Sequence, residues 1–196
     1  MNKTRKQGKW KIPGSAVKIH LPNKFQTKDY TCGGVAMQSI LSYYGAGNFT
    51  EKEMERELNM TNIGTDPWQF KLVLKKYGLN YKEYHAMTQQ QLKYIIDMGK
   101  PVIVTVQAWS NRSLETYRDV WNEGHWITAI GYDGKGFYFE DPTHKDVRGF
   151  IEYDEFEDRW HDIGDNEFPE DHYALVIWGE KVVNKDLKTK YAASTP

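Results

Sequence analysis

The sequence has a single cysteine, Cys32, among 196 residues. One cysteine excludes an intramolecular disulfide framework, so the fold does not depend on an oxidising compartment. An excess of charge is also missing, because 26 Lys and Arg residues face 27 Asp and Glu residues and leave a formal net charge of −1. Such a chain has no overall attraction for nucleic acid or for an anionic membrane, and we expect neither as a partner.

Long apolar runs are absent as well. The basic start, residues 1–9, is similar to the first part of a signal peptide, but no apolar segment follows it. We therefore expect no membrane insertion and a cytoplasmic location for the chain as given, although a secreted form processed before residue 1 is compatible with the sequence. The six histidines lack metal-ligand spacing, so we expect no metal and no cofactor.

What is present in the first half are the signals of short helices. Thr50 with Glu53 and Thr88 with Gln91 form two capping boxes, and Pro67 occupies the first position of a third helix. Glycines that follow the apolar periods supply stop signals. We expect helices over residues 32–44, 50–58, 66–77 and 88–98, preceded by a short strand over 15–21.

The second half is rich in β-branched and aromatic residues. Residues 101–108 form a near-continuous apolar run that is typical of a buried strand. Two further runs, 124–132 and 137–141, flank an Asp-Gly-Lys-Gly turn and predict a hairpin. We also expect strands over 147–151 and 173–178, the last closing the sheet, and a short helix over 154–160 capped by Asp154.

Helices first and an antiparallel sheet later is the α+β pattern. A chain of this length fits one domain, which we expect to span residues 15–179. A flexible segment, 1–14, precedes it, and a frayed polar tail, 180–196, follows it. We expect a helical N-terminal lobe whose cysteine-bearing helix packs on a C-terminal antiparallel sheet, with a substrate cleft between the lobes.

Cys32 begins the first predicted helix. Apolar residues at three-and-four spacing after it indicate a packed helical face, and the positive end of the helix macrodipole favours a thiolate at this position. Gly33 and Gly34 are poor helix formers, yet they would let another backbone come close to the sulfur. The alternative is that Cys32 is one more small buried residue.

His125 opens one strand of the predicted hairpin, and Asp141 ends the other. In an antiparallel pair these two positions can lie side by side, so Asp141 could hold the imidazole of His125 in the right tautomer. Cys32, His125 and Asp141 would then supply nucleophile, base and orienting group. Taken singly, a histidine at a strand end and an aspartate before Pro142 are more often ordinary packing and turn residues.

Gln26 precedes Cys32 by six residues. Its side-chain amide could donate to an oxyanion together with the backbone N–H of Cys32, which is the usual arrangement for stabilising a tetrahedral intermediate. With Gln26 added, the set of four residues favours a catalytic interpretation over four separate structural ones.

These residues carry a family resemblance. Gln26, the string Asp-Tyr-Thr-Cys-Gly-Gly-Val-Ala around Cys32, His125-Trp126 and Asp141-Pro142 resemble the motifs of cysteine peptidase family thirty-nine, papain-like enzymes best known as bacteriocin-processing peptidases that cut after a double glycine. The resemblance covers about residues 19–178 and is closer to the stand-alone members than to the transporter-fused ones. It departs from the leader-peptidase pattern between Gln26 and Cys32 and in extra sequence before His125.

The resemblance implies a papain-like fold and cysteine peptidase activity. Residue by residue, it implies Cys32 as nucleophile, His125 as general base and acid, Asp141 as the group that orients His125, and Gln26 as oxyanion donor. For the substrate side we consider Gly33, Gly34 and the pair that flanks His125, which is Gly124 and Trp126.

The segment between residues 108 and 124 is aromatic and charged and leads directly to His125. Trp109 and Trp121 could therefore line the binding site. They could equally cover the edge of the sheet as ordinary packing, and the sequence does not separate the two.

We therefore expect thiol-dependent hydrolysis of a peptide or amide bond through an acyl-enzyme thioester. The same residues could serve an acyl or peptidyl transferase, because the acceptor is not fixed by fold and triad. A non-catalytic peptide-binding module on the same fold is a third alternative. A redox sensor is disfavoured, since the chain has no second cysteine to resolve an oxidised thiol.

Overall fold

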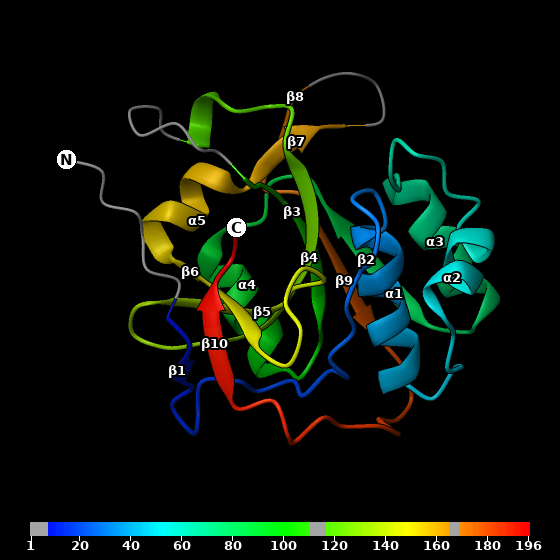
Figure 1. Ribbon diagram of the computed structural model, residues 1–196, viewed down its shortest axis with the longest axis horizontal. Coiled ribbons are helices and arrows are strands. Elements are labelled where there is room, and N and C mark those ends of the chain that lie inside the picture. Colours follow the sequence, from blue (N-terminus) through cyan, green and yellow to red (C-terminus); the bar gives the residue numbers. More distant parts are fainter. Residues whose placement is uncertain (1–7, 110–116, 165–168) are drawn as a thin grey trace.

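A computed structural model describes residues 8–109, 117–164 and 169–196 (Figure 1). An eight-stranded sheet runs through the molecule, and its neighbouring strands are antiparallel except β10 and β6. In spatial order the strands are β1 (Trp10–Lys11), β10 (Tyr191–Ser194), β6 (Arg148–Glu152), β5 (Gly136–Glu140), β4 (Gly124–Tyr132), β3 (Val102–Gln107), β9 (Ala174–Trp178) and β2 (Asn80–Tyr84). A separate two-stranded sheet pairs β7 (His161–Ile163) with β8 (Pro169–Asp171).

The helices lie beside this sheet. They are α1 (Cys32–Tyr43), α2 (Glu51–Glu57), α3 (Pro67–Lys76), α4 (Gln89–Asp97) and α5 (Tyr153–Arg159), with a 3₁₀ turn at Tyr117–Asp119. In Figure 1, α1, α2 and α3 group at one side of the sheet and α5 lies at the other. Helix α1 packs on β4 and on α2, so the predicted arrangement of an α+β fold with the cysteine helix against the sheet is confirmed.

The capping and stop residues identified in the sequence occupy the predicted positions at the helix ends. Both capping boxes form, with the N3 backbone donating to Thr50 and to Thr88. Pro67 takes the first position of α3. Gly78 and Gly99, just after α3 and α4, have φ of 69° and 72°, the left-handed conformation that only glycine adopts without strain.

Helix α1 differs from the one-sided helix that its spacing predicts. All 12 of its residues are buried, because the sheet covers one side while α2 and neighbouring loops cover the rest. Strand β3 is likewise buried along its whole length, as its continuous apolar run predicts. The two elements together form the centre of the core, and the site at the start of α1 is therefore built on rigid structure.

Several expectations are corrected by the structure. Residues 15–21 form no strand, only an isolated bridge between Val17 and Gly131, since Lys18 and Ile19 both donate to the carbonyl of Ile130 and do not continue a regular ladder. Asp154 is not the cap of α5, whose N-cap is Glu152. Strand β9 does not end the sheet, because β2, which the sequence did not indicate, lies beyond it.

The C-terminal segment is also more ordered than the frayed tail expected over 180–196. Residues 191–194 form β10, and Ala192 and Ala193 are buried there. Within the expected flexible segment 1–14, Trp10 and Lys11 form β1 on the outer edge of β10, while residues 1–7 lie outside the described residues. These short strands pair with segments that are distant in the sequence, so no local sequence pattern predicts them. The domain boundaries stay a prediction.

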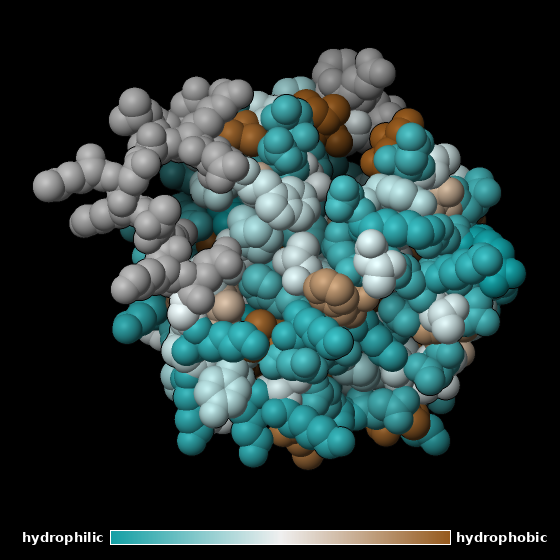
Figure 2. All heavy atoms as spheres, in the orientation of Figure 1, coloured by the Kyte–Doolittle hydropathy of each residue, from teal (hydrophilic) through white to brown (hydrophobic). Residues whose placement is uncertain are grey.

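Polar side chains cover most of the molecular face in Figure 2. Within the described ranges, no helix combines the length and the apolar composition needed to cross a membrane.

A buried charge network ties the segment before α1 to β5. Glu140, the last residue of β5, accepts from the Asn23 side chain at 3.0 Å and from the backbone N–H of Lys24 at 2.9 Å. Its other oxygen forms an ion pair with Arg148 of β6, and both side chains are at most 1 % exposed. Arg148 also donates to the carbonyl of Leu21 at 2.7 Å. The network thus fixes residues 21–24 beside the end of β5.

Replacing Glu140 with Gln should destabilise the fold by about 3 kcal/mol or more, because it leaves the buried Arg148 charge without its main partner. Urea denaturation of the wild type and the variant measures this loss. The control is Glu57→Gln, which removes a more exposed pair with Lys76 and should have a much smaller effect. A Glu140→Gln loss no larger than that of the control would contradict the prediction.

Candidate active site

Cys32 is the first residue of α1, and only 6 % of its surface is exposed. The N-cap residue, Thr31, makes no capping hydrogen bond to the helix, because its hydroxyl contacts the carbonyl of Lys28 and the carboxylate of Glu51 instead. The N-terminal end of α1 therefore keeps its positive pole beside the sulfur, uncapped by a side chain.

His125 and Asp141 meet as the hairpin register predicts. Strand β4 pairs with β5 antiparallel, with Thr128 opposite Glu140, which brings the start of β4 beside the residue that follows β5. His125 Nε2 lies 2.9 Å from Asp141 Oδ1, and both side chains are fully buried. The same carboxylate oxygen accepts from the backbone N–H of Thr143 at 2.9 Å and from its hydroxyl at 2.8 Å.

The pair is ionised at neutral pH. Burial lowers the pKa of His125, but the charge and hydrogen bond of Asp141, with a further contribution from the Cys32 thiol, raise this pKa to about 9. Burial works in the opposite direction on Asp141, where the charge and hydrogen bond of His125 hold the pKa of the carboxyl well below its usual range. Each group therefore stabilises the charged form of the other.

The second ring nitrogen of His125 is left for the thiol. Nδ1 is buried and has no hydrogen-bond partner of good geometry in the described part of the chain. Because Nε2 is engaged by Asp141 and the Cys32 side chain interacts with the ring, Nδ1 is the atom that can exchange a proton with the sulfur. The three residues thus form a continuous line from helix α1 through β4 to the end of β5.

Gln26 is held beside the same strand end. Its backbone N–H donates to the carbonyl of Pro142 at 2.8 Å, and its side-chain amide donates to the carbonyl of Lys28 at 2.9 Å. The same nitrogen has a second, longer contact of 3.5 Å with the carbonyl of Asp29, so the amide, which has two N–H bonds, holds one short and one weak hydrogen bond.

Two cavities flank Cys32 and share Asp29, Asn122 and Gly124 among their lining residues. The first, of about 630 Å³, includes Cys32 itself, together with Tyr30, Thr65, Trp121, Trp126 and Asp162. The second, of about 840 Å³, includes Gln26, Phe25, Trp109 and Thr143. The shared residues make these cavities two arms of one cleft, with Gly124 at their junction.

The predicted aromatic residues reach this cleft in different ways. Trp109 lies with its ring centroid 4.9 Å from that of His125 and has φ of 53°, an unusual conformation for a bulky residue. Trp126 donates from Nε1 to the carbonyl of Thr65 at 2.9 Å. Trp121 packs against His161 at 4.3 Å. The intervening residues 110–116 lie outside the described residues.

Gly33 and Gly34 do not line either cavity among the described residues. A Cβ on Gly33 would lie 2.8 Å from the Thr65 side chain, and one on Gly34 would lie 2.9 Å from the sulfur of Met60. The space beside these glycines is therefore filled by side chains of the same domain. The expectation that they let a second backbone approach the sulfur is not met.

Two polar residues of the site were not among those predicted. Thr143 holds Asp141, and the spacing Asp-Pro-Thr is a local signal for this turn, because an aspartate often accepts from the backbone two residues on. Asp162 of β7 lines the cavity beside Cys32, but no sequence pattern places a residue so far along the chain at this point.

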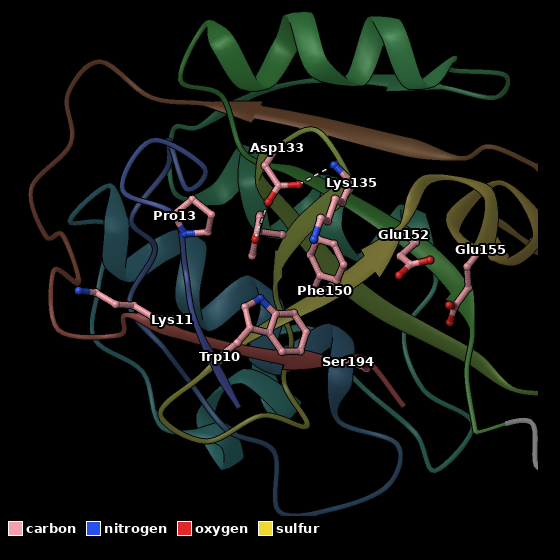
Figure 3. A pocket seen from close by; sticks show the side chains of 10 residues that line it. Trp10, Lys11, Pro13, Asp133, Lys135, Phe150, Glu152, Glu155 and Ser194 are labelled. Carbon is pink, nitrogen blue, oxygen red and sulfur yellow. Dashed lines mark hydrogen bonds between the residues drawn. The ribbon is translucent and has the colours of Figure 1, made fainter. Parts of the chain in front are cut away.

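The described residues contain no group of three or more His, Cys, Asp or Glu side chains that could hold a metal ion. A third cavity, of about 520 Å³, shares no residue with the cleft among those described. Figure 3 shows its aromatic side chains, Trp10 and Phe150, with Glu152 and Glu155 farther along the wall.

Three solved structures of similar fold are peptidases or peptidase domains. A double glycine motif protease from an AMS/PCAT transporter, crystallised with its leader peptide, has a TM-score of 0.58 at 18 % identity, covering 85 % of this chain and 96 % of that one. The peptidase domain of Streptococcus ComA gives 0.58 at 16 % identity, covering 82 % and 98 %. A putative C39-like peptidase from Bacillus anthracis gives 0.62 at 14 % identity, covering 86 % and 100 %.

At these identities the structural likeness shows the papain-like fold. A comparison with curated proteins finds no match. The profile described as "Peptidase_C39 like family" matches residues 18–168, which include Gln26, Cys32, His125 and Asp141. On the strength of that match over most of its length, the chain belongs to the Peptidase_C39-like family.

Proposed function

We propose that this protein is a cysteine peptidase that hydrolyses a peptide bond through a thioester on Cys32. Family and fold both support a peptidase function. The observation that carries the finer proposal is the buried imidazole of His125, which is hydrogen-bonded to Asp141 on one side and interacts with the thiol of Cys32 on the other.

The first step is attack by sulfur. In the proposed resting state the charged His125 already holds the proton of the thiol, so the Cys32 thiolate adds directly to the carbonyl carbon of the substrate and the carbonyl oxygen becomes an oxyanion. The donors proposed for this oxygen are the backbone N–H of Cys32 and the Gln26 amide, whose weak contact with the carbonyl of Asp29 the oxyanion would replace. The positive end of α1 supports the same charge.

The intermediate then collapses. The C–N bond breaks while His125 Nδ1 gives its proton to the departing amine, which leaves an acyl thioester on Cys32. A water molecule, deprotonated by His125, adds to the thioester and releases a carboxylic acid and the free thiol. If an amine replaces water, the same steps give a transferase, and analysis of the products separates the two.

Thiol reactivity tests the pairing of Cys32 with His125. At pH 6.5 we expect iodoacetamide to alkylate Cys32 at least tenfold faster in the wild type than in His125→Gln, because the imidazole promotes the reactive thiolate. Intact-mass spectrometry follows the single adduct, and circular dichroism confirms that the variant is folded. Equal rates in the two proteins, or alkylation only after unfolding, would favour the peptide-binding alternative.

The proposed oxyanion donor gives a second test. Gln26→Ala should lower kcat for hydrolysis of a mixed peptide library about a hundredfold, since it removes one donor to the oxyanion. The alkylation rate of Cys32 should stay near that of the wild type. The matched control is Gln91→Ala, an exposed glutamine at the start of α4. A fall in kcat as small as that of the control would exclude Gln26 from this role.

The ion pair should also appear in the pH dependence of stability. The pKa of His125 is raised to about 9 in the folded protein from about 6.5 in an unfolded chain. Its stabilising contribution is therefore complete below about pH 6.5 and is lost as the pH rises through about 9.

We expect the difference in unfolding free energy between the wild type and His125→Gln to fall between pH 6.5 and pH 9.5, as measured by urea denaturation. Because the pKa of Asp141 is lowered, its own contribution is present throughout this range. A difference that does not change with pH would show that His125 is neutral in the folded protein.

A further inference from the structure

The arm of the cleft that contains Cys32 is acidic. Four carboxylates line it, from Asp29, Asp66, Asp162 and Glu170, and its described lining includes no Lys, Arg or His. The uneven charge is local, because the whole chain has a net charge of only −1.

Asp162 is the carboxylate most firmly built into the wall. Oδ2 accepts from the hydroxyl of Thr105 at 2.8 Å, and Oδ1 accepts from the side chain of Gln107 at 3.1 Å and from the backbone N–H of Ile163 at 2.9 Å. Thr105 and Gln107 are buried residues of β3. The carboxylate is therefore held in one orientation by a rigid strand.

These donors are all neutral, and Asp162 forms no ion pair with any described residue. Glu170, by contrast, contacts His85, and Asp66 accepts from Trp68 at the start of α3. Burial raises the pKa of Asp162, although its hydrogen bonds and the charge of the adjacent His161 act in the opposite direction. One acceptor position on Oδ2 stays open, since only Thr105 donates to that oxygen among the described residues.

Asp162 and Cys32 line the same cavity. The carboxylate of Asp162 lies directly against Gly124, where an added Cβ would collide with it, and Gly124 immediately precedes His125. A group that binds Asp162 therefore lies in the cavity that contains the proposed nucleophile, Cys32.

The rest of this arm fits a cationic side chain. A volume of about 630 Å³ accommodates a long side chain, and the lining includes the aromatic rings of Tyr30, Trp121 and Trp126, whose faces attract cations. Thr65 lines the same cavity, is 8 % exposed, and has a buried hydroxyl without a partner in the described chain. A ligand N–H donor would satisfy such a group.

From this geometry we infer that Asp162 is a specificity-determining residue, which selects substrates with a lysine or arginine side chain next to the bond that is cut. This inference rests on the proposed function, because it names the substrate class of the same site.

The charge of the cleft can be measured without any peptidase activity. Methanethiosulfonate reagents convert a thiolate to a mixed disulfide and release methanesulfinate, and they exist with a trimethylammonium or a sulfonate group. We measure the rate at which each reagent modifies Cys32 and take the ratio of the cationic to the anionic reagent. This ratio is then divided by the ratio measured for the chain unfolded in urea, which gives the normalised ratio. We expect a normalised ratio of about 10 or more for the native protein at low salt, falling toward 1 at 0.5 M salt.

Asp162→Asn should reduce the normalised ratio severalfold while the protein stays folded by circular dichroism. The matched control is Glu152→Gln, which removes one exposed carboxylate from the remote cavity of Figure 3 and should leave the ratio unchanged. A native ratio near 1 at low salt, or equal ratios in Asp162→Asn and the wild type, would overturn the inference. If Asp162→Asn does not fold, the normalised ratio of the native protein and its dependence on salt test the inference.

A peptide library then tests selectivity directly. We expect peptides with Lys or Arg beside the cut bond to show a kcat/KM at least tenfold above that of neutral peptides, and we expect this preference to vanish in Asp162→Asn. Cleavage without such a preference overturns the inference and leaves the proposed function standing. If Cys32 prefers the cationic reagent but no peptide is cleaved, the result supports the charge selectivity of the cleft and counts against the peptidase proposal.

Discussion

The buried pair of His125 and Asp141 constrains the structure around it more than any other contact. Two ionisable side chains without solvent exposure are tolerated only when they are paired and their remaining atoms are satisfied. Asp141 Oδ1 accepts from Thr143 as well as from His125, whereas the buried Asp141 Oδ2 and His125 Nδ1 have no partner among the described residues. The neighbouring Glu140 and Arg148 form a second buried pair, which also binds the segment that leads to Gln26. Helix α1, the hairpin and this segment are thereby fixed relative to one another at one point.

The same arrangement explains how a helix and a hairpin from separate parts of the chain form one site. Cys32 depends on the packing of α1 against β4, whereas His125 and Asp141 depend on the register of β4 with β5. A shift of one residue in that register would turn His125 away from Asp141. Trp109, in its unusual backbone conformation, packs beside the imidazole. A strained residue at this position is consistent with a functional site, where such strain is often retained.

Local signals in the sequence were enough to predict the elements that hold the reacting groups. Capping boxes and glycine stops placed the helices, and the turn between residues 133 and 136 fixed a hairpin whose register brings His125 to Asp141. Contacts between distant segments could not be predicted in this way. Strands β1, β10 and β2 form by pairing with segments that are remote in the sequence, and Asp162 reaches the cleft only through β7. Gly33 and Gly34 were misjudged for the same reason, since the side chains that fill the space beside them come from α3 and from the loop before it.

The acidic arm of the cleft has a consequence for the chemistry as well as for binding. In the proposed reaction, negative charge develops on the substrate oxygen in the transition state, and the carboxylate of Asp162, which lines the cavity of Cys32, would oppose it. A cationic side chain bound to that carboxylate cancels the opposing charge at the moment when the oxyanion forms. The substrate therefore stabilises the transition state more than it stabilises its own bound ground state, and this differential effect raises kcat. In such a site, selectivity for a cation is expressed in turnover and does not depend on tight binding alone.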